Sequence, residues 1–328
     1  MVEKNMVNTI SNRKLYIDQG KGIGIFLVLL GHFYTFSGQY HTFINELIYL
    51  FHMPLFFFLS GVVTKMVVND KEFLVKKTRR LLVPFVFWLV FYIFYTHSTW
   101  SAVFDKMKLG VWYLQALFLF GIIHMAYSWI ASKINMKNQW SVDIAIGVFV
   151  YIMMKVVYHV CMWAPIDLNG LLGNIHFVNF WPYFFIGVLM KKHQLMERGL
   201  KSSLMPIVYL AIFVVGVICI IGFKMGFFLF DMAVVMSIIM LILSVLERFG
   251  GGNKSLAKLG EHSLAIYVVH YAFILKLIDF LDQHQLITHS HVDFISFFVL
   301  SILLCLLCMF IERLIGTSRW ARRIMFGY

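Results

Sequence analysis

Charged residues are scarce in this chain of 328 residues. Asp, Glu, Lys and Arg together make up 13% of it, whereas 61% of the residues are hydrophobic and the mean hydropathy is +0.81. A soluble domain of this size does not need so much apolar surface. The composition therefore excludes an ordinary soluble domain and indicates a helical protein that crosses a membrane several times.

Cysteine is also rare, and its placement argues against redox or metal chemistry. All four cysteines lie in apolar runs, and Cys305 and Cys308 form a C-x-x-C pattern beside leucines. Such a pattern is typical of small apolar residues on a helix. The first fifteen residues are polar, and the first apolar run has no small-residue cleavage site, so we expect no cleavable signal peptide.

Several catalytic motifs are absent. The sequence has no Walker loop, no dinucleotide-binding glycine fingerprint, no H-E-x-x-H and no G-x-S-x-G. The histidines are scattered over different apolar segments, whereas a metal site needs clustered ligands. We therefore predict no metal site.

Ten apolar segments of about 16–24 residues follow one another along the chain, and each has the length of a membrane-spanning helix. They lie near 17–37, 44–64, 81–96, 110–132, 140–163, 170–190, 203–223, 227–246, 263–282 and 292–315. The sequence thus predicts an all-α fold, a polytopic integral membrane bundle of about ten transmembrane helices. Because the linkers are short, we expect residues 1–328 to form a single domain.

The positive charges predict the orientation. If the N-terminus is cytoplasmic, 23 of the 28 Lys and Arg residues fall on the inner side and three on the outer side. This asymmetry predicts that both termini are cytoplasmic, in a multi-pass protein of the cell (plasma or inner) membrane. The net charge of +12 is then a topology signal that also attracts anionic membrane lipid, and we expect no nucleic-acid partner.

The run from Lys21 to His32, KGIGIFLVLLGH, places a cation at the start of an apolar helix and a histidine eleven residues later. On a helix these two residues share a face to within roughly 20° and stand about 16 Å apart. A histidine in such a run is costly unless it has a function or a partner. The pattern leaves two interpretations open, a catalytic residue and a packed, hydrogen-bonded one.

Two further runs allow both a structural and a functional interpretation. In FHMPLFFFLSG (51–61), Pro54 predicts a break and Ser60-Gly61 permits a close approach of helices. This segment is either a kinked packing helix or the wall of a cavity. KKTRRLLVP (76–84) suits membrane anchoring, but Lys77 and Arg80 lie one helical turn apart and could also form a phosphate-binding site.

The order of these motifs resembles the acyltransferase-3 family of integral membrane acyltransferases, in the branch similar to fucose 4-O-acetylase. The resemblance covers nearly the whole chain. It rests on Asp18, K-x10-H, FFFLSG, the basic R-L-x-x-P turn, WYLQALF (112–118), PYFFIGVLMKK (182–192) and LGEHSLAIYVVH (259–270).

The resemblance implies transfer of an acyl group, usually acetyl, to a hydroxyl of a cell-surface glycan or its lipid-linked precursor. The donor substrate would be acetyl-CoA or another acyl-CoA at the cytoplasmic side, with no bound cofactor. His32 matches the catalytic histidine of the family's R-x10-H. Lys21, Lys77 and Arg80 match family positions implied to bind acyl-CoA, with lysine in place of arginine at the first two. We expect the cavity to be lined by Asp18, Ser60, Trp112 and His270.

Two other functions remain open from the residues alone. A glycan exporter or transporter could use intramembrane His and Lys residues as a gate or a proton relay, although no inverted repeat is evident. A scaffold or sensor of the cell envelope would tolerate changes at Lys21, Arg80 and His32.

Overall fold

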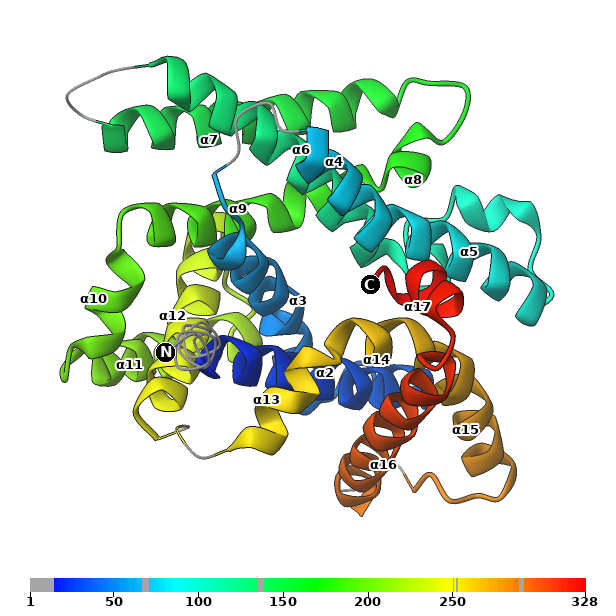
Figure 1. Ribbon diagram of the computed structural model, residues 1–328. Coiled ribbons are helices and arrows are strands. Elements are labelled where there is room, and N and C mark those ends of the chain that lie inside the picture. The colour runs from blue at the N-terminus through cyan, green and yellow to red at the C-terminus, as the bar shows by residue number, and fades with distance from the viewer. Residues whose placement is uncertain (1–14, 67–70, 135–138, 250, 252, 289–291) are drawn as a thin grey trace, which may run out of the picture.

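The computed structural model describes residues 15–66, 71–134, 139–249, 251, 253–288 and 292–328, and the elements in these ranges are all helical (Figure 1). The first half contains α2 (Leu15–Phe36), α3 (Phe43–Val63), α4 (Lys71–Lys77), η1 (Thr78–Leu82), α5 (Val83–Tyr95), η2 (Trp100–Val103), η3 (Lys108–Gly110), α6 (Trp112–Lys133) and α7 (Gln139–Cys161). The second half contains α8 (Leu168–Leu172), α9 (Asn174–Lys192), α10 (Leu195–Lys201), α11 (Met205–Val217), η4 (Ile218–Gly222), α12 (Phe228–Phe249), α13 (Lys254–Glu261), α14 (Ser263–Val269), α15 (Tyr271–Gln283), α16 (Val292–Ile315) and α17 (Arg319–Phe326).

The protein is a polytopic helical membrane protein, as the sequence predicted. Each of the ten predicted segments contains a helix. Among the described residues, seven helices are long and apolar enough to cross a membrane, or up to eight if the bent pair α14–α15 counts as one span. The total of ten spans and the cytoplasmic location of both termini stay predictions.

The two predicted spans outside that set, α2 and α9, are apolar helices that carry buried polar side chains. Figure 1 shows α2 and α3 near the middle of the molecule, with α6 and α7 on one side and α15 and α16 on the other. Most of α2 is buried, including Asp18 and Gln19, and α9 buries Asn174 and His176. By contrast, few residues of α7 and α11 are buried, and both helices present apolar side chains outward. The helices with buried polar side chains are thus covered by protein, and the outer ones can face lipid.

The third predicted segment begins earlier than the sequence suggested. Helix α4, the π-helix η1 and α5 form one span from Lys71 to Tyr95, so the basic run 76–80 lies within a helix and not in a loop. Pro84 explains the π-turn, because its ring would clash with the carbonyl four residues earlier and it has no N–H to donate. Consistent with a wider turn, the Val83 N–H donates to the Thr78 carbonyl.

The structure differs from the sequence-based prediction in where two helices are interrupted. Helix α3 runs through Pro54 without the predicted break, which membrane bundles tolerate when neighbouring groups satisfy the freed carbonyl. The ninth segment, predicted as a single helix, is instead bent by 52° between α14 and α15, at His270. No proline or glycine marks this bend in the sequence.

Glycines allow two pairs of helices to touch backbone to backbone. A Cβ atom at Gly61 of α3 would overlap the Phe184 carbonyl oxygen of α9, and one at Gly187 of α9 would overlap the Phe58 carbonyl oxygen of α3. The same applies between α2 and α13, where Gly22 and Gly260 face each other's backbone. Such contacts bring helices together where the membrane supplies no hydrophobic force between them.

The loop before α6 is held by a buried lysine. Lys108, Leu109 and Gly110 all have positive φ angles, a strained conformation for the first two. The Lys108 ammonium donates to the carbonyls of Val103 (2.7 Å) and Gly170 (2.6 Å), which ties the turn to α8. Burial lowers the pKa of Lys108 to about 8, although the nearby carboxylates of Asp105 and Asp167 act in the opposite direction.

The α3–α9 crossing should not tolerate a side chain at Gly61. Replacing Gly61 with alanine forces the two backbones apart, and overpacking of this kind costs roughly 1–3 kcal/mol or more. We expect Gly61→Ala to lower the thermal unfolding temperature of the detergent-solubilised protein. Gly222→Ala is the matched control, because the nearest atom to its added Cβ lies 4.0 Å away. Equal unfolding temperatures for the two variants would contradict the close crossing.

Lys108 should make stability depend on pH. Its pKa is about 8 in the folded protein and about 10.5 when unfolded, so between these values the unfolded chain binds more protons. We therefore expect the stability of the wild type, measured against Lys108→Met, to rise from pH 8 to pH 10.5 and to stay constant below pH 7. Thermal unfolding of both proteins across this range measures the difference, and a fall in that interval would contradict the assignment.

Candidate active site

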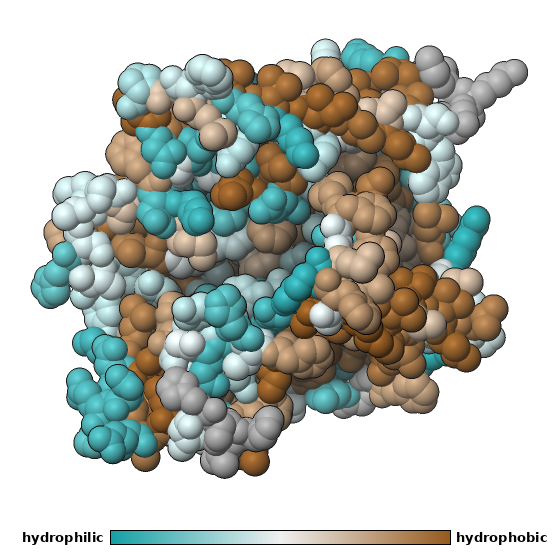
Figure 2. Space-filling model, turned by 180° about the vertical axis from the view of Figure 1, so that it is seen from behind, coloured by the Kyte–Doolittle hydropathy of each residue, from teal (hydrophilic) through white to brown (hydrophobic). Residues whose placement is uncertain are grey.

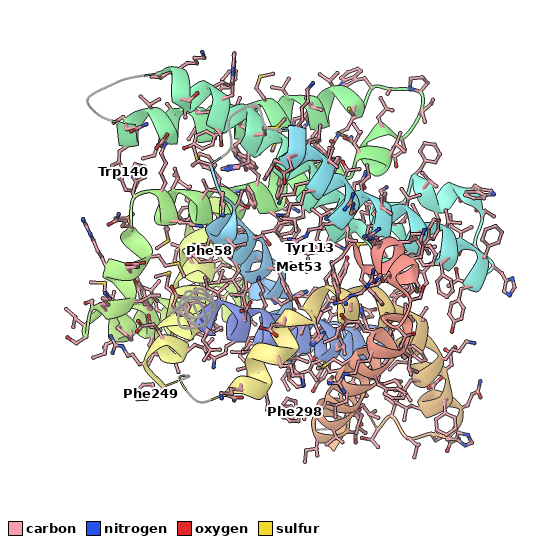
Figure 3. The ribbon with its side chains drawn as sticks, in the orientation of Figure 1. Met53, Phe58, Tyr113, Trp140, Phe249 and Phe298 are labelled. Carbon is pink, nitrogen blue, oxygen red and sulfur yellow. The ribbon has the colours of Figure 1, made fainter. Side chains whose placement is uncertain are left out.

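A cavity of about 760 Å³ lies between α2, α3, the α4–η1 segment, α6, the α13–α14 segment and the C-terminal residues after α16. Met53 and Tyr113, two of its lining residues, lie close together near the centre of the molecule in Figure 3. Figure 2, viewed from behind, shows a hollow at the centre of the opposite face, bordered by hydrophilic residues. The helices of the interior thus surround a space whose lining combines apolar and charged side chains.

The cavity carries an excess of positive charge. Its lining includes two acidic residues, Glu72 and Glu261, and five basic ones, Lys21, Lys65, Lys76, Lys77 and Arg80. A concave site with this balance attracts an anionic ligand, because the low-dielectric walls concentrate the positive potential. The predicted trio of Lys21, Lys77 and Arg80 is therefore brought together on one cavity.

The π-turn and a glycine position the two cations of the third span. Lys77 ends α4 and Arg80 lies within η1, so the residues are three apart and both reach the cavity. The stem of Lys77 extends past Gly121 of α6 and its ammonium lies 5.5 Å from the centre of the Phe73 ring. This packing places the cation against the cavity while the apolar stem covers apolar surface.

Lys21 lies in the second turn of α2, with its Nζ 3.8 Å from Asp18 Oδ1. Asp18 is buried, and its backbone faces Gly260 of α13. Asp18 therefore touches Lys21 but does not itself line the cavity, contrary to the prediction. The physical reason is the close α2–α13 contact, which covers that side of α2.

A row of hydroxyl groups leads away from the cations. Ser60 Oγ lies 3.1 Å from Tyr113 Oη, and the backbone N–H of Tyr113 donates to Tyr267 Oη at 3.2 Å. The Tyr267 hydroxyl in turn donates to the Gly110 carbonyl, in the turn that Lys108 holds. Ser60, Tyr113 and Tyr267 all line the cavity, and the first of these was predicted to do so.

His270 links Tyr267 to His32. The His270 ring centre lies 6.1 Å from that of Tyr267, one turn earlier, and 5.3 Å from that of His32, on which it stacks. Its Nδ1 lies 3.1 Å from the Ile266 carbonyl, which can only accept, so Nδ1 carries a proton. In a neutral ring Nε2 is then an acceptor, and this buried atom has no hydrogen-bond partner among the described residues. Buried polar atoms without a partner are rare, and a catalytic role is one of the reasons for which proteins retain them.

His32 is partly exposed and its ring is held on three sides. Phe36 and His270 stack on it at centre distances of 5.2 and 5.3 Å, and Nδ1 lies 3.3 Å from the Tyr49 hydroxyl. The Tyr49 ring also contacts that of His52 at 4.9 Å. His32 of α2 and His52 of α3 therefore meet at Tyr49, and His270 from the α14–α15 bend joins them through its stack on His32. Neither His32 nor His270 is among the residues that line the cavity itself.

Trp112, which was also predicted to line the cavity, points elsewhere. Its ring stacks on His176 at 3.8 Å and on Phe180 at 5.5 Å. The next residue, Tyr113, lines the cavity in its place, because successive residues of a helix point about 100° apart. Tyr113 and Tyr267 are the functional candidates that the sequence analysis did not single out. The sequence features that could have identified them are the position of Tyr113 directly after Trp112 and the position of Tyr267 three residues before His270.

Comparisons with known proteins identify a family for this chain. A family model described as an acyltransferase domain matches residues 14–310, which is most of the chain. The nodulation protein NolL of Mesorhizobium japonicum is 34% identical over 87 residues, or 24% of this chain and 23% of that protein. The chain thus spans about a quarter of the length of this curated relative. No solved structure matches the chain.

These matches do not identify a branch within the family, so the resemblance to fucose 4-O-acetylase stays a prediction. The family itself follows from the extent of the match and from the ordered motifs on their helices. A helical membrane bundle with a basic cavity and a nearby histidine cluster is the scaffold on which they lie. The chain belongs to the acyltransferase-3 family of membrane acyltransferases.

Proposed function

We propose that the protein transfers an acyl group, acetyl in the simplest case, from acyl-CoA to a hydroxyl of a cell-surface glycan or its lipid-linked precursor. The observation that carries this proposal is the basic cavity that gathers Lys21, Lys77 and Arg80. CoA carries several phosphates, and charge-assisted hydrogen bonds from lysine and arginine are strong partners for them. If the N-terminus is cytoplasmic, this cavity opens toward the compartment that contains acyl-CoA.

The pantetheine arm of the donor would extend from the cations toward the histidines. The helix places Lys21 and His32 about 16 Å apart, and Ser60, Tyr113 and Tyr267 supply hydroxyl groups along the intervening wall. In this arrangement the phosphates stay at the basic end of the cavity. The thioester would extend beyond the lining of the cavity, past Tyr267, to the histidine cluster.

His32 is proposed as the general base. Its imidazole takes the proton of the acceptor hydroxyl as that oxygen attacks the thioester carbonyl carbon, and the C–S bond breaks. The CoA thiolate then takes the proton from the imidazolium, so the histidine ends neutral. His270 supports this role because its buried Nε2 is a second acceptor beside His32, suited to orienting a hydroxyl group.

An exporter is the other function considered, and the bend at His270 is the feature that favours it, because transporters use broken helices at their substrate sites. Transporters typically have such helices in pairs, and the described residues contain one bent pair. Membership of an acyltransferase family favours transfer over export. Export of glycan from vesicles without any acyl donor would favour the alternative.

Replacing His32 should abolish transfer while the fold survives. A general base contributes roughly 10²–10⁴-fold to a rate, so we expect His32→Gln to slow incorporation of labelled acetyl from acetyl-CoA into envelope glycans by that factor. His41→Gln is the matched control, since His41 is exposed and lies outside the histidine cluster. If His32→Gln transferred acetyl at the wild-type rate in membranes with equal protein content, His32 would not be the general base.

The two cations of the third span should act on donor binding. We expect Lys77→Gln and Arg80→Gln each to raise the KM for acetyl-CoA about tenfold or more, because each loses a charged hydrogen bond worth roughly 1.5–3 kcal/mol, with a smaller effect on kcat.

Arg79→Gln serves as the control for this pair, because Arg79 is an exposed neighbour that does not line the cavity. Initial rates over a range of acetyl-CoA concentrations separate KM from kcat. An unchanged KM in both cavity variants, or an equal rise in the control, would show that the donor phosphates bind elsewhere.

A further inference from the structure

A second cavity, of about 600 Å³, lies between α2, α13 and α16. It shares no lining residue with the first cavity, and the two lie on different faces of the α2–α13 pair. None of the residues placed in the proposed transfer reaction lines it. Any function of this groove is therefore separate from the proposed one.

One wall of the groove is an apolar stripe on α16. Phe298, Ile302, Leu306 and Phe310 follow one another at four-residue spacing, so they lie on one helical face, and each is 40–57% exposed. Phe26 of α2 packs against Phe298 edge to face at 5.0 Å and closes the far end of the groove. Figure 3 shows Phe298 on the side of α16 that faces α13.

The opposite end of the groove is cationic. Arg313, in the last turn of α16, and Lys258 of α13 both line it, and both are exposed. The lining contains no acidic residue. Glu312, the neighbour of Arg313, does not line the groove and pairs with His262 at 2.7 Å, although its charge also acts on Arg313. Among the described residues, none lies within ion-pair distance of Lys258 or Arg313, so both side chains can contact a ligand in the groove.

The dimensions match one leaflet of a bilayer. From Phe298 to Arg313 the helix rises about 22 Å, and one leaflet with its headgroup region is also about 20–22 Å thick. An acyl chain can therefore lie along the apolar stripe while the phosphate group, at headgroup level, reaches Arg313 and Lys258. Asn253 and Ser255 also line the groove; the Asn253 Oδ1 caps α13 by accepting from the Leu256 N–H.

We propose that this groove binds an anionic phospholipid of the surrounding membrane. Its phosphate lies between Lys258 and Arg313, and one acyl chain lies along the α16 stripe against Phe26. The charge pattern selects this occupant, because a zwitterionic lipid offers no net charge to the two cations. A polar peptide would not suit the apolar wall.

The binding test uses native mass spectrometry of the purified full chain with phosphatidylglycerol and phosphatidylcholine of identical acyl chains. We expect the wild type to prefer phosphatidylglycerol. The double variant Lys258→Gln/Arg313→Gln should lose roughly 30-fold in phosphatidylglycerol affinity, since each basic residue at a membrane surface contributes about a fivefold factor.

The matched control is Lys254→Gln/Arg319→Gln, which removes two exposed charges from α13 and α17 outside the groove. It should keep the wild-type preference. Equal wild-type affinities for the two lipids, or an equal loss in the control, would overturn the proposal.

A second variant tests the apolar wall. Leu306→Trp fills the groove at an exposed position, so the fold should tolerate it, and phosphatidylglycerol affinity should fall while both cations remain. Soluble glycerol 3-phosphate should not compete, because it lacks the chain. Undiminished lipid affinity in Leu306→Trp, or full displacement by glycerol 3-phosphate, would mean that the groove does not hold a lipid chain.

Discussion

The close backbone contact of α2 with its neighbours is the constraint on which the site depends. A helix that carries Asp18, Gln19, Lys21 and His32 cannot face lipid, so it must be covered by other helices. Gly22 makes this cover possible by letting α13 approach to backbone distance. Once α2 is fixed in this way, Lys21 reaches the basic cavity at one end of the helix and His32 reaches the other histidines toward the opposite end.

The bend between α14 and α15 completes the arrangement. It brings His270 onto His32 and keeps Tyr267, one turn earlier, on the cavity wall. Tyr267 also hydrogen-bonds to the turn that Lys108 anchors, so a loop outside the span helps to fix the interior. Inside a membrane such polar groups need partners within the protein, and the row of hydroxyls and carbonyls supplies them. The same row gives the cavity a polar wall.

Much of the site could be predicted from the sequence because cations and histidines in apolar helices are rare and therefore informative. Lys21, Lys77, Arg80 and Ser60 do line one cavity. The prediction was wrong where the direction of a side chain around its helix determines whether it lines the cavity. Trp112 is the example, because its ring packs on His176. It also erred where chain geometry depends on tertiary contacts.

No proline or glycine in the sequence predicts the bend at His270, whereas the predicted break at Pro54 does not occur. In both places the neighbouring helices decide the path of the chain, and periodicity within one segment does not contain that information. The basic run 76–80 is a third example. Its positive charge suggested a loop, but a π-turn next to Pro84 lets it continue as a helix.

In the folded molecule, several basic residues line cavities, which the positive-inside pattern of the sequence alone does not predict. An excess of Lys and Arg on one side is sufficient to orient a membrane protein, and no specific position is needed for that effect. Here, however, five basic residues line one cavity and Lys258 and Arg313 line another, on different faces of the α2–α13 pair. A simple topology signal would leave these side chains spread over loops. Their convergence at two concave sites gives each site a positive potential that attracts anions, an effect that the orientation of the chain does not require.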